Sequence, residues 1–283
     1  MEVRHAVLPA ALAVLLLSAC SRKEQEPATQ AAAPPAAPAA ASSTAAPAAG
    51  ASTGIDPQAS TALEGMGRHL RSLKAFTVHG AATIDVVDEN DRKARVPGSV
   101  DYKVQVPDGL QMDVQGPHKH RQLFFDGKRM TLWAPDIKYY ATVDAPPTIG
   151  ELLARAEERY GITLPLADLF LWGTDKAPLS SIQSGKVGGH DTIGGTGCTR
   201  YVFQQPQVEW EVCIRDGDAP LPLRLTITDT EDPARPQFIN TLTWDTAPKL
   251  AKTGFTFTPP KDAHRIQIVE RGGGQPATAG GAP

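Results

Sequence analysis

The sequence predicts an α+β domain built on a strongly curved antiparallel sheet of about eleven strands, a half-open β-barrel with two or three helices covering its concave face. Three observations predict this fold class. Asp-Gly pairs at 108–109, 126–127 and 216–217 each lie between strand-like runs, which is a strong hairpin signal. Only two long amphipathic helical patterns interrupt the strands. A sheet of this many strands curls strongly.

The first residues of the sequence predict an export signal. Residues 1–19 contain a basic start, an apolar run from Ala6 to Leu17 and small residues, and the run is too short to span a bilayer comfortably. The segment Leu17-Ser-Ala-Cys20 resembles a bacterial lipobox, which implies cleavage before Cys20 and a diacylglyceryl group on its sulfur. Ser21 resembles the outer-membrane sorting pattern, so we expect a lipid-anchored protein that faces the periplasm. The alternative is an ordinary secretory signal with a chance cysteine.

Residues 20–55 are predicted to be the lipidated cysteine and a flexible linker. From Pro27 to Gly54 there are fourteen Ala, five Pro and no charged residue. The prolines prevent a long helix, and the segment has too little apolar bulk to fold. Fully extended, it would reach about 100 Å. The linker would therefore let the domain stand well away from the membrane.

Residues 56–270 are long enough for one domain with one sizeable core, and a Gly-rich tail at 271–283 is expected to be disordered. The formal net charge of −3 gives no reason to expect a nucleic-acid partner. We expect a monomer without a cofactor.

Two helices and a short third are predicted. Asp56, followed by proline, fits the N-cap of the first helix. Thr148 fits the start of a capping box for the second helix, which Gly161 would end. A short helix is expected within 165–171. Further strands are expected at 76–87, 98–106, 109–115, 137–143, 181–188, 221–229, 237–245, 253–258 and 264–269.

The hairpin from Gly197 to Ile214 has the most clearly specified register. Pairing Phe203 with Val208 closes a four-residue loop. One face then carries the aromatic residues, and the other carries Arg200 opposite Glu211. A slip of one residue would bury the charged pair and break up the aromatic pair.

The same register places Cys198 opposite Cys213. If they form a non-hydrogen-bonded pair, their Cα atoms lie about 4.5 Å apart, within disulfide reach. We therefore expect a cross-strand disulfide, which fits export to an oxidising compartment. The alternative is two unrelated buried thiols. With Cys20 lipidated, no thiol is left for metal binding or nucleophilic catalysis.

The hairpin about Asp126-Gly127 indicates which face of the sheet is apolar. Alternation puts four apolar side chains on one face and a more polar set, which includes Arg129 and Thr131, on the other. We expect the apolar face, with two leucines of the second helix, to line a ligand cavity. The candidate ligand-binding residues are Leu123, Phe125, Met130, Leu132, Leu152 and Leu153. The alternative is a fully packed inner face, which would make the domain a structural module.

A family resemblance rests on segments across nearly the whole domain. They are Asp56-Pro57, Met66 through Phe76, Tyr140 through Pro146, Tyr160 through Leu169, Gly197-Cys198, Glu209-Trp210, Asp216 through Pro222 and Phe255 through Pro260. Together they resemble domain-of-unknown-function family 2092, a group of predicted periplasmic proteins. The family is similar in architecture to the lipoprotein carrier LolA and its receptor LolB, which implies an open barrel with a helical lid around a cavity for acyl chains. The family often has an aromatic residue at the position of Cys213. The resemblance therefore does not imply the disulfide, which is predicted from the register alone.

Few side chains suggest chemistry other than binding. His118 and His120 flank a lysine, which opposes a metal ion, so we expect no metal site. Asp168 has two interpretations, a functional carboxylate or, as we favour, a side chain that caps a local helix or hydrogen-bonds to the backbone. The glycine-rich stretch 194–197 leads into a strand, which is a poor context for a phosphate loop. We predict no catalytic residue.

Three functions follow, of which we favour the first. It is a non-enzymatic, membrane-anchored periplasmic lipoprotein that binds a lipid or an acylated lipoprotein in its half-barrel. The second is a sensory or protein-binding module like RseB, which resembles LolA in fold. The third, an enzyme, lacks a recognisable nucleophile, metal set or cofactor loop.

Overall fold

The computed structural model describes residues 54–88, 92–117, 119–177 and 179–271. The predicted signal peptide, Cys20, nearly all of the linker, His118 and the tail from residue 272 lie outside these ranges.

Twelve strands form one sheet in the order β12-β6-β5-β4-β3-β2-β1-β11-β10-β9-β8-β7. All neighbours are antiparallel except β12 and β6, and β12 and β7 are the two edges, so the sheet is open. The strands are β1 Ala75–Val87, β2 Lys93–Gln105, β3 Gly109–Gly116, β4 Lys119–Phe125, β5 Arg129–Ala134, β6 Tyr139–Asp144, β7 Ser184–Ile193, β8 Thr196–Gln204, β9 Val208–Arg215, β10 Pro222–Asp229, β11 Gln237–Asp245 and β12 His264–Arg265.

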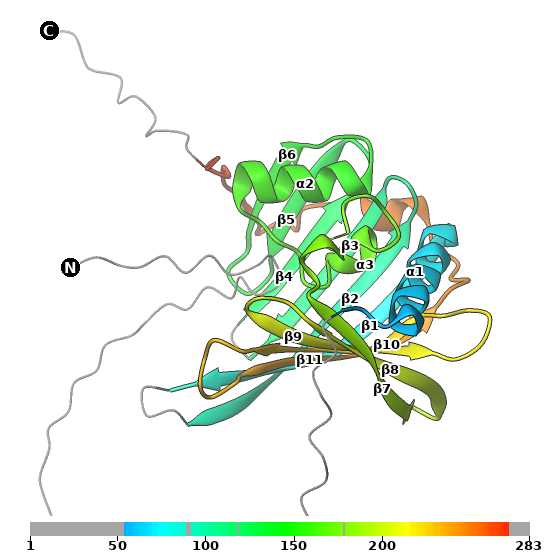
Figure 1. The fold of residues 1–283 in the computed structure, drawn as a ribbon. Helices are drawn as coiled ribbons and strands as arrows, with labels where there is room; N and C mark the ends of the chain where they lie inside the picture. Colours follow the sequence, from blue (N-terminus) through cyan, green and yellow to red (C-terminus); the bar gives the residue numbers. More distant parts are fainter. Residues whose placement is uncertain (1–53, 89–91, 118, 178, 272–283) are drawn as a thin grey trace, which may run out of the picture.

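The predicted α+β class with a strongly curved antiparallel sheet is confirmed. The half of the sheet with β3–β6 stands at a steep angle to the half with β8–β11, and the helices lie on the enclosed side (Figure 1). In the described residues the α-helices are α1 Pro57–Ser72, α2 Ile149–Tyr160 and α3 Asp168–Leu171, with 3₁₀ turns η1 Leu179–Ser181 and η2 Lys252–Phe255.

The helix ends form as their sequences predict. The Asp56 side chain accepts a hydrogen bond from the Gln58 N–H and caps α1. Thr148 Oγ1 accepts one from the Glu151 N–H at the start of α2. Gly161 follows α2 in the left-handed conformation, with φ 66°. These local signals fix where both helices begin and end before any packing is considered.

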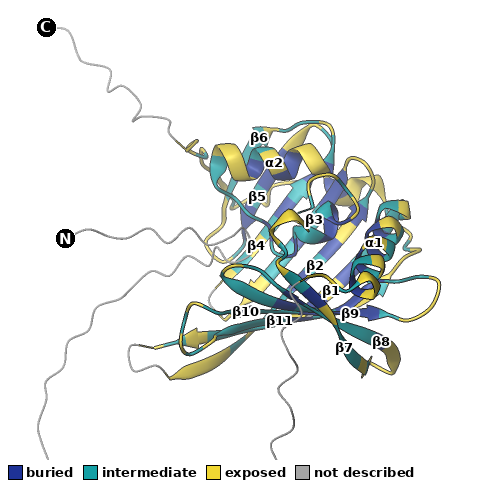
Figure 2. Cartoon of the chain, in the orientation of Figure 1, coloured by how far each residue is buried: buried dark blue, intermediate teal, exposed yellow. Residues whose placement is uncertain are grey.

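The core lies between the inner face of the sheet and the helices. Apolar residues at alternate positions of the strands and on the inner sides of α1, α2 and α3 form one buried cluster. In Figure 2 the buried colour follows this enclosed side, whereas the far ends of β1 and β2 are exposed. Burial of this cluster is the dominant stabilising contribution to the fold.

The expected strand at 253–258 is wrong. Residues 252–255 form the 3₁₀ turn η2, and the chain then crosses the outer face of the sheet without joining it. Alternation in Phe255-Thr-Phe-Thr258 reflects packing onto the sheet, since the Phe257 ring lies 5.3 Å from that of Phe124. The expected strand at 264–269 shrinks to the two residues of β12.

The hairpin of β8 and β9 has the predicted faces but not the predicted register. Gln204 pairs with Glu209, so the four-residue loop lies one residue further along the chain than expected. Phe203 then lies directly opposite Trp210, and the rings stack at 4.3 Å. This aromatic contact is the physical reason for the observed register.

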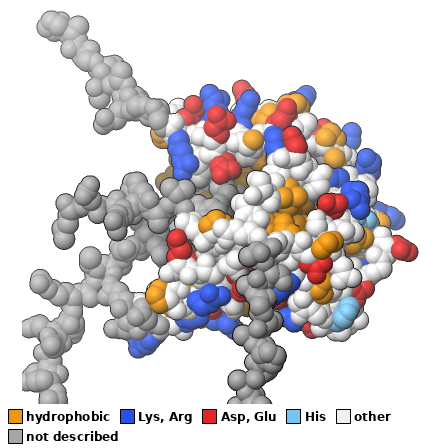
Figure 3. Space-filling view, in the orientation of Figure 1, with side chains coloured by type: hydrophobic (Ala, Val, Ile, Leu, Met, Phe, Trp, Pro, Cys, Tyr) orange, Lys and Arg blue, Asp and Glu red, His pale blue; other side chains and the backbone are white. Residues whose placement is uncertain are grey.

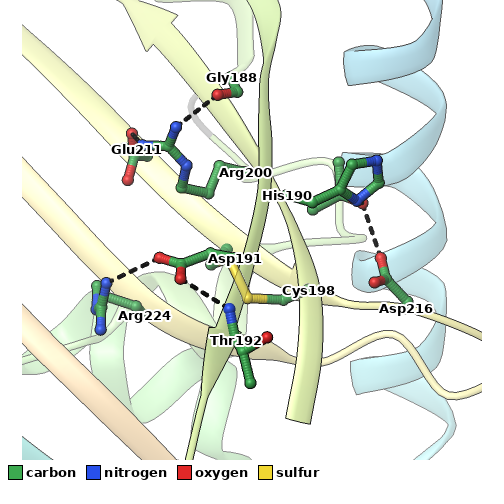
Figure 4. The surroundings of a disulfide bond; sticks show 11 residues. Gly188, His190, Asp191, Thr192, Cys198, Arg200, Glu211, Asp216 and Arg224 are labelled. Atoms are coloured by element: carbon green, nitrogen blue, oxygen red, sulfur yellow. Dashed lines mark hydrogen bonds and ion pairs between the residues drawn. A yellow bond between two sulfur atoms is a disulfide. The ribbon is translucent and has the colours of Figure 1, made fainter. Parts of the chain in front are cut away.

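The predicted disulfide joins Cys198 and Cys213, whose Cα atoms are 5.6 Å apart. Because of the register, the two cysteines are diagonal neighbours, and Cys213 pairs with Arg200. The bond lies in a small cluster of its own with Ile193 and Leu223, separate from the main core. Figure 4 shows it beside the ion pair of Arg224 with Asp191, with Arg200 and Glu211 above it.

Candidate functional site

The structure brings the six predicted ligand-binding residues into the one main core. Leu123 and Phe125 on β4 are completely buried, and Met130 on β5 is only 1% exposed. Leu132 is half-buried, and Leu152 and Leu153 of α2 are buried in the same cluster. Because Leu123 and Phe125 have no exposed surface, a ligand could reach them only if the covering helices moved.

The cover over this face is the segment from Leu164 to Trp172, which includes α3 and which we name the lid. Most of its apolar side chains are in the main core. Few polar contacts hold it. The Tyr102 hydroxyl of β2 donates to the Pro165 carbonyl, and the Arg71 guanidinium of α1 donates to the carbonyls of Leu169 and Phe170.

The end of the lid touches α1 through glycine. A Cβ placed on Gly67 of α1 would lie only 2.6 Å from the backbone N of Gly173, directly after the lid. Any side chain at Gly67 would therefore push the helix and the lid apart. The Arg71 Nε beside this contact is buried without a hydrogen-bond partner.

One polar side chain lies on the apolar inner face. Asn240 on β11 is completely buried, and neither its Oδ1 nor its Nδ2 has a hydrogen-bond partner. Its strand neighbour on the same face, Leu242, and its cross-strand partner Leu225 both belong to the main core. Gly80 of β1 makes room for the amide, because a Cβ there would lie 2.4 Å from Asn240 Oδ1. An unpaired buried amide costs about 1–3 kcal/mol, so its presence needs an explanation.

Sequence reasoning missed Asn240, although a signal existed. In the strand 237–245, alternation puts Asn240 on the same face as Phe238 and Leu242. A single amide among apolar residues on one face of a strand was therefore the signal that could have identified it.

The apolar inner face continues beyond the fully buried core. Half-buried side chains packed against the core include Val114, Leu132, Val143, Val208, Ile227 and Phe238. The space-filling view shows hydrophobic side chains in the middle of this side of the molecule, near α3 (Figure 3). The inner face therefore presents partly exposed apolar side chains next to the buried core.

Asp168 does not act as the helix cap that we favoured. It lies in the first turn of α3, and among the described residues its carboxylate has no hydrogen-bond or ion-pair partner. Burial raises its pKa above the ordinary value of 3.8. The lid thus carries a carboxylate that its surroundings do not stabilise.

Other polar clusters have structural partners. His120 Nε2 lies 3.0 Å from Asp113 Oδ1. Thr199 Oγ1 donates to Asp216 Oδ1 and lies 3.1 Å from His190 Nδ1, on an exposed edge of the sheet. Within the described ranges, no three side chains of the metal-ligating types come together.

Comparisons with known proteins find one matching family and several similar solved structures. A family model described as "Predicted periplasmic protein (DUF2092)" matches residues 59–269. Among solved structures, the chain is similar to the lipoprotein LppX of Mycobacterium tuberculosis, with 14% identity, a TM-score of 0.44 and coverage of 69% of this chain and 98% of that one. No curated protein matches the chain.

Two further solved structures are similar. MucB has 11% identity and a TM-score of 0.40, with coverage of 72% of this chain and 64% of that one. A LolA superfamily protein from Nitrosomonas europaea has 8% identity and a TM-score of 0.34, with coverage of 70% and 97%.

Proposed function

This chain belongs to the DUF2092 family of predicted periplasmic proteins, and we propose that it is a non-enzymatic protein that binds an apolar ligand in the periplasm. The ligand is a lipid or the acylated end of a lipoprotein. It lies between the inner face of the sheet and the lid, against Leu123, Phe125, Met130, Leu132, Leu152 and Leu153.

The observation that carries the proposal is an apolar face covered by a lid with three polar contacts. A hydrogen bond contributes about 1 kcal/mol, and one from a charged donor about 1.5–3, so the three together contribute roughly 4–7 kcal/mol. Burying about fourteen methylenes of an acyl chain yields roughly 11 kcal/mol. If the lid moves outward and covers the ligand, the apolar side chains of the lid stay buried. Burial of the acyl chain then contributes more free energy than the loss of the three hydrogen bonds costs, so the bound state is favoured.

Asn240 supplies the polar part of the recognition. A lipid or acylated peptide carries an ester or amide carbonyl next to its hydrocarbon. The Asn240 amide can donate to that carbonyl, which gives this buried group the partner that it lacks in the closed form. A ligand with such a carbonyl would thus be preferred over a plain hydrocarbon.

The lipid at Cys20 ties the protein to a membrane, and Ser21 favours the outer membrane on its periplasmic side. Two or three acyl chains hold a protein firmly. In the described ranges, no helix is long and apolar enough to cross a bilayer.

The test is native mass spectrometry of the protein purified from a bacterial periplasm, followed by titration with a fluorescent fatty acid. We expect co-purified lipid and saturable binding of the probe. Protein that is free of lipid and does not bind the probe would contradict the proposal. A partner protein recovered by crosslinking, with little lipid, would instead favour the RseB-like alternative.

A further inference from the structure

A cavity of about 180 Å³ lies on the outer face of the sheet, opposite the proposed lipid site. Its floor is the outer face of β4, β5 and β6, and its cover is the segment 255–265, which we name the strap. It is smaller than the 300–1,000 Å³ typical of sites for drug-sized molecules. It therefore suits a small chemical group.

The strap is fixed at both ends of its path. Phe257 packs among Phe124, Trp133 and Tyr140, with ring centroids 5.3–5.5 Å away. The backbone of β12 then pairs with β6. An ion pair of Asp262 with Lys138 adds a further contact. The cavity is thus formed by two segments that are distant in the sequence but held together.

Two arginines line the cavity from these two segments, Arg129 from β5 and Arg265 from β12. In the described part of the chain, neither guanidinium has an ion-pair or hydrogen-bond partner. Asp144 faces Arg129 in the register without forming an ion pair with it. Unpaired cations at a cavity favour an anion.

The two arginines outnumber the one carboxylate in the cavity lining. Asp126, the carboxylate in the lining, already accepts hydrogen bonds from the N–H groups of Lys128 and Arg129 in its turn. The hydroxyls of Thr131 and Thr142 lie 2.9 Å apart, and only one of them can donate to the other. The second hydroxyl proton is free for a ligand oxygen.

We propose that this cavity binds a small oxyanion of the phosphate class. Arg129 and Arg265 hold two of its oxygens through guanidinium N–H groups, and a threonine hydroxyl donates to a third. The same group occurs as free phosphate or a soluble phosphate ester and as the headgroup of an anionic phospholipid. This site is independent of the apolar ligand, since the sheet separates the two.

The test is an NMR titration of the ¹⁵N-labelled mature chain, with Cys20→Ser to leave it without lipid, by inorganic phosphate at constant ionic strength. Saturable shifts are expected at Thr131, Thr142 and Phe257. Arg129→Gln and Arg265→Gln should each weaken binding at least tenfold. Arg121→Gln, an exposed arginine of β4 outside the cavity, makes the same charge change and should have no effect.

The source of the anion is decided by sedimentation with vesicles of phosphatidylglycerol against vesicles of phosphatidylcholine. If the chain sediments with the anionic vesicles, and Arg129→Gln and Arg265→Gln abolish this while Arg121→Gln does not, the anion is a lipid headgroup. If the chain binds phosphate but does not sediment with the vesicles, the anion is a free phosphate. Both outcomes support the site. Unchanged Phe257 and Ile266 signals in the ligand-free variants show that the strap is still in place. The absence of saturable phosphate shifts, or an equal loss in Arg121→Gln, would overturn the proposal.

Discussion

At the scale of single residues, two polar groups lie where the surroundings do not stabilise them. Asn240 is an unpaired amide in the main core, and Asp168 is a carboxylate partly buried in the lid. Each lowers the stability of the closed form. Groups of this kind often occur at functional sites.

Replacing Asn240 with leucine removes the unpaired amide and keeps its branched shape. We expect the free energy of unfolding to rise by about 1–3 kcal/mol, because the penalty for the buried amide disappears. Urea unfolding followed by tryptophan emission measures this. The affinity for an acyl ester should fall in the same variant, while the affinity for a plain hydrocarbon does not. A less stable variant would show that the amide has a partner.

Asp168→Asn should make stability less dependent on pH. The raised pKa means that the folded state holds the proton more tightly than the unfolded chain. Below the unfolded value of 3.8 the carboxyl is neutral in both states, and there is no penalty. As pH rises through the folded pKa, the charged group destabilises the fold. The variant should therefore be more stable than the native protein at about pH 7.5 and equal to it at about pH 3.5 in urea unfolding. Asp175→Asn, an exposed carboxylate nearby, is the control, and an equal gain there would contradict the argument.

At the scale of elements, local sequence signals predicted the ends of the helices and the positions of turns better than they predicted which residues pair across strands. Asp56, Thr148 and Gly161 define the helices because each capping bond forms within a few residues. The register of β8 with β9 could not be predicted to the residue, because a shift of two positions leaves every side chain on its face. The observed register is the one that places Phe203 directly opposite Trp210.

The candidate site was predictable in its apolar part alone. Alternation placed Leu123 and Phe125 on the inner face, where they lie. The lid contacts and the outer cavity join segments far apart in sequence, such as Arg71 with Phe170 and Arg129 with Arg265. No local pattern encodes such pairs.

The contact of α1 with the lid can be tested through two glycines in one helix. Gly67→Ala would place a methyl group against the Gly173 backbone, so we expect a loss of about 1–3 kcal/mol of stability. Gly65→Ala meets nothing closer than 3.9 Å and should stabilise α1 by about 0.5–1 kcal/mol. Thermal unfolding of both variants measures the difference.

Hydrogen exchange then shows whether Gly67→Ala acts on the lid. Faster exchange is expected at 164–172, with β8 and β9 unaffected. If both alanine variants were equally stable, the close approach of Gly67 to Gly173 would be disproved.

At the scale of the whole molecule, one sheet separates two environments. The inner face is apolar and contacts the lid, and the outer face at β4–β6 carries polar side chains together with the aromatic rings that contact the strap. The tryptophans report on both sides. Trp172 and Trp210 lie together in the main core, with ring centroids 6.3 Å apart, whereas Trp133 contacts Phe257 on the outer face.

The most direct test of the central claim is quenching of tryptophan emission by a brominated fatty acid, which requires contact with the indole. The account predicts saturable quenching that Trp133→Phe leaves intact and Trp172→Phe reduces. No quenching, or quenching that Trp133→Phe alone removes, would contradict binding between the sheet and the lid.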